Sequence, residues 1–165
     1  MPLVFRTSPA HVGSSVCAKQ RPSTKHFCIL VLSLLLLRGA DVAAPRYGLL
    51  QGCGQTATLT IAATAESRRQ GIRRMVDFGA ADGMAFVYAQ PTPPAFWMHD
   101  TVIPLDIFFL SPTGRLLARH TMAPLSDTRY TAPAPILVVL EFPVAAPQTQ
   151  QIHIGTTCQI LLPTR

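Results

Sequence analysis

The residues best suited to bind a ligand or take part in acid–base chemistry lie together near the middle of the chain. They are Trp97, Met98, Asp100, Thr101 and Asp106. Small-molecule sites are mostly apolar and aromatic cavities that contain a few precisely placed polar groups, and this segment offers both kinds of side chain. We therefore predict these five residues as the candidates for ligand binding, and the catalytic residues stay unassigned.

Two of these residues, Asp100 and Asp106, are candidates for acid–base catalysis. A pair of carboxylates can act as general acid and general base when both lie in one pocket and their environments give them different pKa values. Asp100 and Thr101 also suit a turn, which short polar side chains stabilise by bonding to nearby backbone. Asp106 interrupts an apolar strand, where a buried carboxylate needs a partner. It either faces solvent, pairs with an arginine (Arg69, Arg73 or Arg119) or contacts a ligand.

The sequence gives little support to metal, nucleophilic or phosphate-binding chemistry. No His-x-x-x-His or Cys-x-x-Cys pattern occurs, and such spacings are typical of metal sites. Ser111 and Ser126 lie in turn-like segments without the strand–turn–helix elbow of a nucleophilic serine. No Gly-rich phosphate loop is present. We expect no metal and no cofactor.

The positive charge of the chain is concentrated at its amino-terminal end. The formal net charge is +6, and residues 1–44 contribute most of it, with five basic residues and one acid. Residues 45–165 hold nine basic residues and seven acids, so this part is nearly neutral. A nucleic-acid surface requires a concentrated basic patch on the folded domain. We therefore expect no nucleic-acid partner.

The amino-terminal segment has the pattern of an export signal. Residues 27–37 form an apolar run that follows Arg21 and Lys25 and precedes several small residues. A bilayer-spanning helix needs about 20 apolar residues, so the run is too short to span a membrane and is typical of a signal peptide. We predict a signal peptide and leader over residues 1–44, a linker over residues 45–55, and export to the periplasm.

Two cysteines remain after the leader, Cys53 and Cys158. In an oxidising compartment they are a candidate disulfide between the two ends of the domain. The sequence Leu-Gln-Gly-Cys (residues 50–53) also resembles a lipoprotein box, which would place a lipid anchor on Cys53. Two free thiols are the third alternative. Membrane contact is expected only through the signal peptide or such an anchor.

The pattern of the remaining residues predicts a mainly β domain over residues 56–163. Alternating or apolar runs predict strands at residues 56–61, 84–88, 102–110, 115–122 and 136–142, with one or two more in 151–162. Thr64 caps one short helix near residues 64–76, with Ile72 and Val76 on its apolar face and its arginines (Arg68, Arg69 and Arg73) toward solvent. Residues 90–95 and 123–135 are expected to be irregular. Short strands at this spacing indicate a single small antiparallel β-sandwich or barrel.

Several motifs in this order resemble the domain-of-unknown-function family 192 (DUF192). They are Gly-Met-Ala-Phe-Val (residues 83–87), Phe-Trp-Met-His-Asp-Thr (96–101), Ile-Pro-Leu-Asp-Ile (103–107) and Val-Leu-Glu (139–141), preceded by Glu66 and Arg-Gln-Gly-Ile (69–72). The resemblance implies a small, mainly antiparallel domain of sandwich or jelly-roll type, often behind an export signal, with no established activity. His99-Asp100 replaces the family's Lys-Asn, and a glycine expected after Leu-Glu is missing.

These observations predict an exported, monomeric module of the cell envelope that binds a small molecule or a peptide. One alternative is a hydrolase-type enzyme that uses Asp100 and Asp106, which should then converge in one cavity with perturbed pKa values. The other is an envelope assembly factor, which should show an exposed strand edge or apolar patch and no pocket. A binding module predicts an aromatic pocket.

Overall fold

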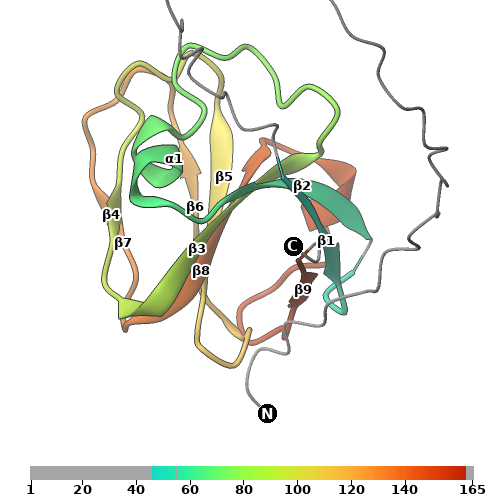
Figure 1. Cartoon of the computed structure of the whole chain (residues 1–165). Helices are drawn as coiled ribbons and strands as arrows, with labels where there is room; N and C mark the ends of the chain where they lie inside the picture. The colour runs from blue at the N-terminus through green and yellow to red at the C-terminus, as the bar shows by residue number, and fades with distance from the viewer. Residues whose placement is uncertain (1–45, 55, 163–165) are drawn as a thin grey trace, which may run out of the picture. The chain divides into compact units, whose positions relative to one another are not determined.

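A mixed sheet of seven strands forms the frame of the protein (Figure 1). The computed structural model describes residues 46–54 and 56–162, so the predicted signal peptide lies outside the described residues. The strand order is β6-β5-β8-β3-β2-β1-β9. The bounds are β1 (Tyr47–Gln51), β2 (Ala57–Ala62), β3 (Gly83–Thr92), β5 (Leu105–Leu110), β6 (Leu116–Met122), β8 (Ile136–Pro143) and β9 (Gln159–Leu161).

Smaller elements complete the fold. Strands β4 (Ala95–Phe96) and β7 (Tyr130–Thr131) pair as a separate two-stranded sheet. The helices are α1 (Ala65–Gln70) and the 3-10 turn η1 (Pro147–Thr149). None of the helices within the described ranges has both the length and the apolar character that crossing a membrane requires. The predicted mainly β class with one short helix is confirmed.

The sheet departs from the predicted antiparallel arrangement at one pair of strands. β2 and β3 are parallel, whereas every other pair in the sheet is antiparallel. Parallel neighbours require a crossover connection, usually through a helix. Here residues 63–82, which include α1, bring the chain back to the start of β3. Asp82 and Gly83 therefore lie where this crossover ends and β3 begins.

The predicted linker over residues 45–55 is wrong, because β1 occupies most of it. β1 pairs with β2 on one side and with β9 on the other, and Leu50 is completely buried. A strand of only five residues carries a weak periodic signal in the sequence. The folded domain therefore begins before residue 56.

The helix begins where predicted and ends earlier. The Thr64 hydroxyl accepts a hydrogen bond from the Ser67 backbone N–H at 3.0 Å, so Thr64 is the N-cap. The helix stops at Gln70 because Gly71 has a φ of 51°, a conformation that glycine adopts easily. Beyond this point the helical spacing no longer holds. Ile72 is buried but Val76 is 73% exposed, so the predicted face over residues 64–76 is wrong after Gln70.

Two segments expected to be irregular contribute strands. β3 continues through Pro91 to Thr92, with a register shift against β8 after Val87. A proline is tolerated at such an irregularity because it has no N–H to donate. β7 lies in the predicted loop 123–135 and pairs with β4. By contrast, the predicted turn between β5 and β6 is confirmed, since the Gly114 N–H donates to the Ser111 carbonyl at 2.9 Å.

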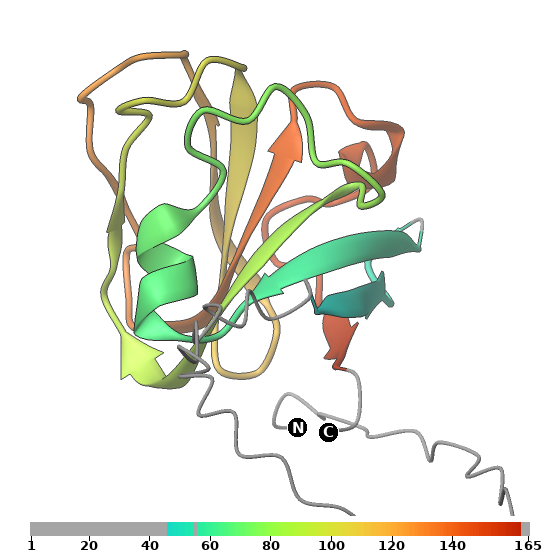
Figure 2. The same ribbon diagram turned by 45° about the horizontal axis from the view of Figure 1, so that its top comes forward.

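Apolar side chains pack on both faces of the sheet. The first core includes Leu59, Phe108, Leu140, Phe142 and Ile160. The second includes Phe86, Met98, Ile107, Phe109 and Val139. Helix α1, the segment after it and the β4–β7 pair lie over the second face (Figures 1 and 2).

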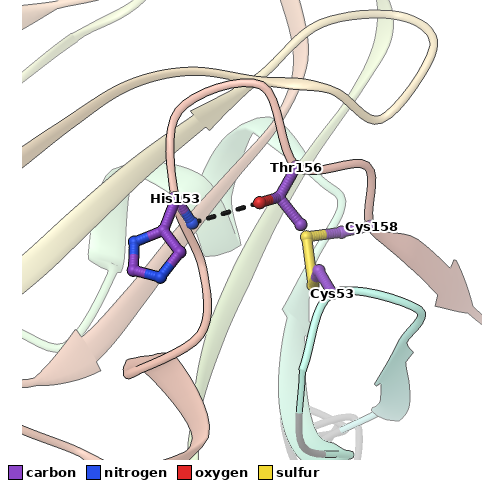
Figure 3. Close-up of a disulfide and its surroundings, with 4 residues drawn as sticks. All are labelled: Cys53, His153, Thr156 and Cys158. Atoms are coloured by element: carbon purple, nitrogen blue, oxygen red, sulfur yellow. Dashed lines mark hydrogen bonds between the residues drawn. A yellow bond between two sulfur atoms is a disulfide. The ribbon is translucent and has the colours of Figure 1, made fainter.

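The curled sheet is not closed into a barrel, although its two edges meet at one point. The Leu116 N–H donates to the Thr156 carbonyl at 2.8 Å, and the Cys158 N–H donates to the Gly114 carbonyl at 2.9 Å. A disulfide between Cys53 and Cys158, 105 residues apart in sequence, fastens the loop after β1 to the chain just before β9 (Figure 3). Both cysteines are buried in the first core. A sulfur in this bond cannot also carry a lipid.

Candidate functional site

A half-open cavity of about 190 Å³ lies over the second face of the sheet. Four parts of the chain line it: α1 with the turn that follows, β3, β4 with the segment after it, and β8. The lining residues are Arg68, Arg69, Gln70, Gly71, Ile72, Arg73, Phe86, Tyr88, Ala95, Phe96, Trp97, His99, Thr101 and Glu141. The site is therefore assembled from segments that lie far apart in the sequence.

Aromatic rings form one wall of the cavity. The Phe86 ring on β3 meets the Phe96 ring on β4 edge to face, with centroids 5.0 Å apart. This favourable geometry holds the β4–β7 pair against the main sheet. Trp97, the next residue, is 37% exposed, and the Arg129 guanidinium lies over its ring at 3.8 Å from the centroid. Trp97 is thus a wall residue that solvent and a ligand can reach.

The arginines of α1 do not all point to solvent as predicted. Arg68 donates from one nitrogen to the carbonyls of Ala63 and Val87, at 2.6 and 2.9 Å. Its guanidinium also lies 4.7 Å from the centre of the Tyr88 ring. Arg68 therefore ties the helix to β3 and contributes a positive charge to the cavity wall.

The other two arginines of the cavity are exposed at its rim. Arg69 is paired with Glu66 one turn earlier on α1. Arg73 is exposed, and in the described part of the chain no ion pair involves it. Arg73 is therefore free to receive an anionic group, whereas Arg69 would first exchange its partner.

Glu141 is the most unusual residue of the cavity. It lies on β8, opposite Met84 of β3 and Ile107 of β5, and is only 5% exposed. Among the described residues its carboxyl has no hydrogen-bond partner, yet no side-chain oxygen there is both fully enclosed and unbonded. The Glu141 oxygens must therefore reach the space of the cavity that this residue lines.

Burial determines the protonation of Glu141. Removal from water disfavours the charged form and raises the pKa of Glu141 to about 8. At neutral pH the side chain is mostly a neutral acid, which can donate one hydrogen bond and accept others. Burial also raises the pKa of the Tyr88 hydroxyl, with Arg68 lowering it and Glu141 raising it further. The polar lining therefore consists mainly of hydrogen-bond donors.

The structure brings two of the five predicted residues to the cavity. Trp97 and Thr101 line it, and Thr101 is 5% exposed. Met98 is completely buried in the second core. Asp100 has a φ of 62° in the turn after β4, and its carbonyl accepts a hydrogen bond from the Arg74 N–H at 2.9 Å. Neither Met98 nor Asp100 lines the cavity.

Asp106 belongs to a structural ion pair on the opposite face of the sheet. It shares that face with Phe108, whereas its neighbour Ile107 lies opposite Glu141. Arg119 donates to one carboxylate oxygen at 2.7 Å and the Thr121 hydroxyl donates to the other at 2.6 Å. Of the alternatives left open by the sequence, the structure selects the pair with Arg119. Asp100 and Asp106 do not converge, so the hydrolase alternative lacks the geometry that it requires.

One further polar residue of the cavity lining, His99, is already paired. His99 lies 2.9 Å from the Asp127 carboxylate, an exposed contact between the segment after β4 and the loop before β7. Over residues 46–54 and 56–162, no group of three or more His, Cys, Asp or Glu side chains is placed to hold a metal ion. No metal chemistry is assigned to the cavity.

Sequence reasoning missed Glu141 as a site residue and treated it only as part of the Val-Leu-Glu motif. One signal could have identified it. Glu141 is the single acid in the most hydrophobic strand of the chain, and a strand paired on both sides leaves a charged side chain little access to water. Arg68 and Arg73 carried no comparable signal, because arginines on a short helix are usually solvated.

Over the described residues, the fold and the cavity define a small, mainly β domain with a pocket lined mainly by hydrogen-bond donors. The sequence profile of the DUF192 family, described as an uncharacterized ACR, matches residues 49–160. The chain therefore belongs to the DUF192 family. The match begins within β1, in agreement with a domain that starts before residue 56.

Two crystal structures share this fold. A protein of unknown function from Novosphingobium aromaticivorans is 26% identical, with a TM-score of 0.61 over 72% of this chain and 94% of that one. A protein from Sinorhizobium meliloti, named as a candidate transcription regulator, is 24% identical, with a TM-score of 0.57 over 70% of this chain and 91% of that one. The second likeness shows the fold alone. No curated protein matches the chain.

The Asp106–Arg119 ion pair predicts that removing the arginine alone lowers the free energy of unfolding more than removing both charges. Arg119→Met keeps much of the side-chain volume but leaves a carboxylate that is 1% exposed with Thr121 as its remaining partner. We expect a loss of roughly 3–5 kcal/mol in the free energy of unfolding, measured by urea denaturation. Adding Asp106→Asn to this variant should restore part of the loss. A loss below about 1 kcal/mol would show that the pair contributes no more than an exposed one.

Glu141 predicts a pH-dependent stability. Its pKa is about 8 in the folded protein and 4.5 in a solvated reference, so the folded state holds an extra proton between these values. The free energy of unfolding should therefore fall as pH rises from 4.5 to 8, by up to about 1.4 kcal/mol per pH unit. Glu141→Gln mimics the neutral acid and should remove this slope in denaturation curves recorded across that range. Identical slopes in the two proteins would disprove the assignment.

Proposed function

We propose that this protein is an exported ligand-binding module of the cell envelope, which takes a small molecule or the end of a peptide into the cavity between α1 and the sheet. The observation that carries the proposal is Glu141, a buried acid that has no hydrogen-bond partner among the described residues and whose oxygens reach an aromatic-walled cavity. A ligand group placed in the cavity can therefore form a hydrogen bond with the Glu141 carboxyl.

The volume of the cavity favours a small ligand. A space of about 190 Å³ accommodates a compact molecule or one terminal side chain, and not an extended peptide. Its wall combines apolar rings with a few fixed polar groups, which is the usual composition of ligand sites. Trp97 is the exposed part of this wall and supplies contact area with little loss of rotamer freedom.

The two alternative functions are less well supported. A hydrolase using Asp100 and Asp106 would need both carboxylates in one cavity, and neither lines it. An assembly factor would show an exposed strand edge or an apolar patch and no pocket, whereas this protein has a cavity. The chain just before β9 also bonds to the start of β6 and covers part of that edge.

Export to the periplasm has two supports. The first is the apolar run at residues 27–37, which follows basic residues and precedes small ones. The second is the disulfide between Cys53 and Cys158, because such bonds persist in oxidising compartments. The disulfide also favours ordinary export over a lipid anchor on Cys53, since both modifications require the same sulfur atom.

A ligand screen by thermal shift tests the binding function. Protein produced from the full-length gene should be stabilised by at least one compound class in a library of small carboxylates, amines and neutral aromatics. Trp97→Ala should weaken the binding of each hit by about tenfold or more, because an aromatic contact is lost. Tyr47→Ala is the matched control, since Tyr47 is 41% exposed and lies on β1 outside the cavity lining. An equal effect of both variants would contradict the proposed site.

Intact-mass spectrometry of the mature protein from the envelope fraction tests the localisation. We expect a chain without residues of the leader, without lipid, and lighter by two hydrogen atoms than the reduced form. The Cys53→Ser variant should be exported with the same amino terminus. A lipid mass that disappears in this variant would show instead that Cys53 is the anchor.

A further inference from the structure

We infer that the ligand of the cavity is a small organic anion with an apolar body, held by the rim arginines and by the carboxyl group of Glu141 acting as a hydrogen-bond donor. This inference rests on the proposed binding function and specifies the chemistry of the ligand. It depends on three features of the cavity: the sign of its charges, the direction of its hydrogen bonds and the composition of its walls.

The charges around the cavity are predominantly positive. Arg68 and Arg69 come from α1, and Arg73 comes from the segment after it. Within the described ranges, only Arg69 among these three has a carboxylate partner, Glu66, which is exposed and does not line the cavity. A cleft lined by charges of one sign concentrates ligands of the opposite sign. Guanidinium groups bind carboxylate and phosphate groups with two parallel hydrogen bonds.

The groups that face Glu141 add no negative charge. β3 contributes Met84 beside it and the Tyr88 hydroxyl, and β5 contributes the apolar side chain of Ile107. The segment after β4 contributes His99, whose nearest acid, Asp127, is exposed and outside the cavity lining. The only charged side chains that α1 and the segment after it contribute are arginines, so Glu141 is the single acid among the lining residues.

The protonation of Glu141 fits an anionic ligand and opposes a cationic one. With its pKa near 8, Glu141 is an O–H donor at neutral pH and can bond directly to a ligand oxygen. An amine would have to enter past three arginines and would gain an ion pair only after Glu141 lost its proton. The ring walls formed by Phe86, Phe96 and Trp97 then accept the apolar body of the ligand.

Three probes that share one ring separate these alternatives: benzoate, benzylamine and benzyl alcohol, titrated by calorimetry from pH 6 to pH 9. We expect benzoate to bind at least about tenfold more tightly than the other two at pH 7, a difference that one charge-assisted contact can supply. Above pH 8 the affinity for benzoate should fall by up to about tenfold per pH unit, because ionised Glu141 repels the anion and no longer donates.

Two variants and one control assign the effect to named residues. Glu141→Gln should bind benzoate with nearly the same affinity from pH 6 to pH 9, because an amide donates at every pH. Arg73→Gln should weaken benzoate by about tenfold and leave benzyl alcohol unchanged. Asp77→Asn also removes one carboxylate but lies outside the cavity lining, so it should retain the wild-type pH profile.

The outcomes distinguish this inference from the proposed function. Tighter binding of benzylamine than of benzoate would overturn the anionic ligand and leave a binding cavity in place. The same conclusion would follow if the benzoate affinity of the wild type and of Glu141→Gln changed equally with pH. If the thermal-shift library contains no compound whose binding depends on Trp97, the binding function itself fails and this inference fails with it.

Discussion

The burial of a carboxylic acid in a strand that is hydrogen-bonded on both sides is the constraint on which the site depends. β8 pairs with β3 on one side and with β5 on the other, so Glu141 cannot turn its backbone toward solvent. Its side chain must lie on the second face, among apolar neighbours. The sheet tolerates it because the raised pKa keeps it neutral and a cavity receives its oxygens.

The cavity exists because the elements over this face are short and fastened at a few points. α1 ends at Gln70 after less than two turns, and Arg68 anchors it to β3 through the Val87 carbonyl. The Phe86–Phe96 contact positions the β4–β7 pair beside the helix. The same contacts that position these elements therefore leave room for a ligand.

Local rules in the sequence predicted the parts of this arrangement that depend on neighbouring residues. The Thr64 cap, the turn before β6 and the alternating strands follow from short-range chemistry, and the structure has all three. Strand alternation also placed Asp106 on the face opposite Ile107. Features set by distant segments escaped prediction. They include the pairing of β1, the parallel β2–β3 neighbours and the exposure of Glu141 to a cavity formed by α1 and β4.

Two buried acids on adjacent strands show why position alone does not reveal function. Asp106 and Glu141 are both nearly inaccessible, and they lie on opposite faces of the sheet. Asp106 accepts hydrogen bonds from Arg119 and Thr121 of the neighbouring strand β6, and these bonds offset the free energy lost when its carboxylate is buried. Glu141 has no such partner among the described residues and faces a cavity instead. An acid that the fold satisfies is part of the structure, whereas an acid that the fold leaves unsatisfied beside an open cavity is the one to assign to a ligand.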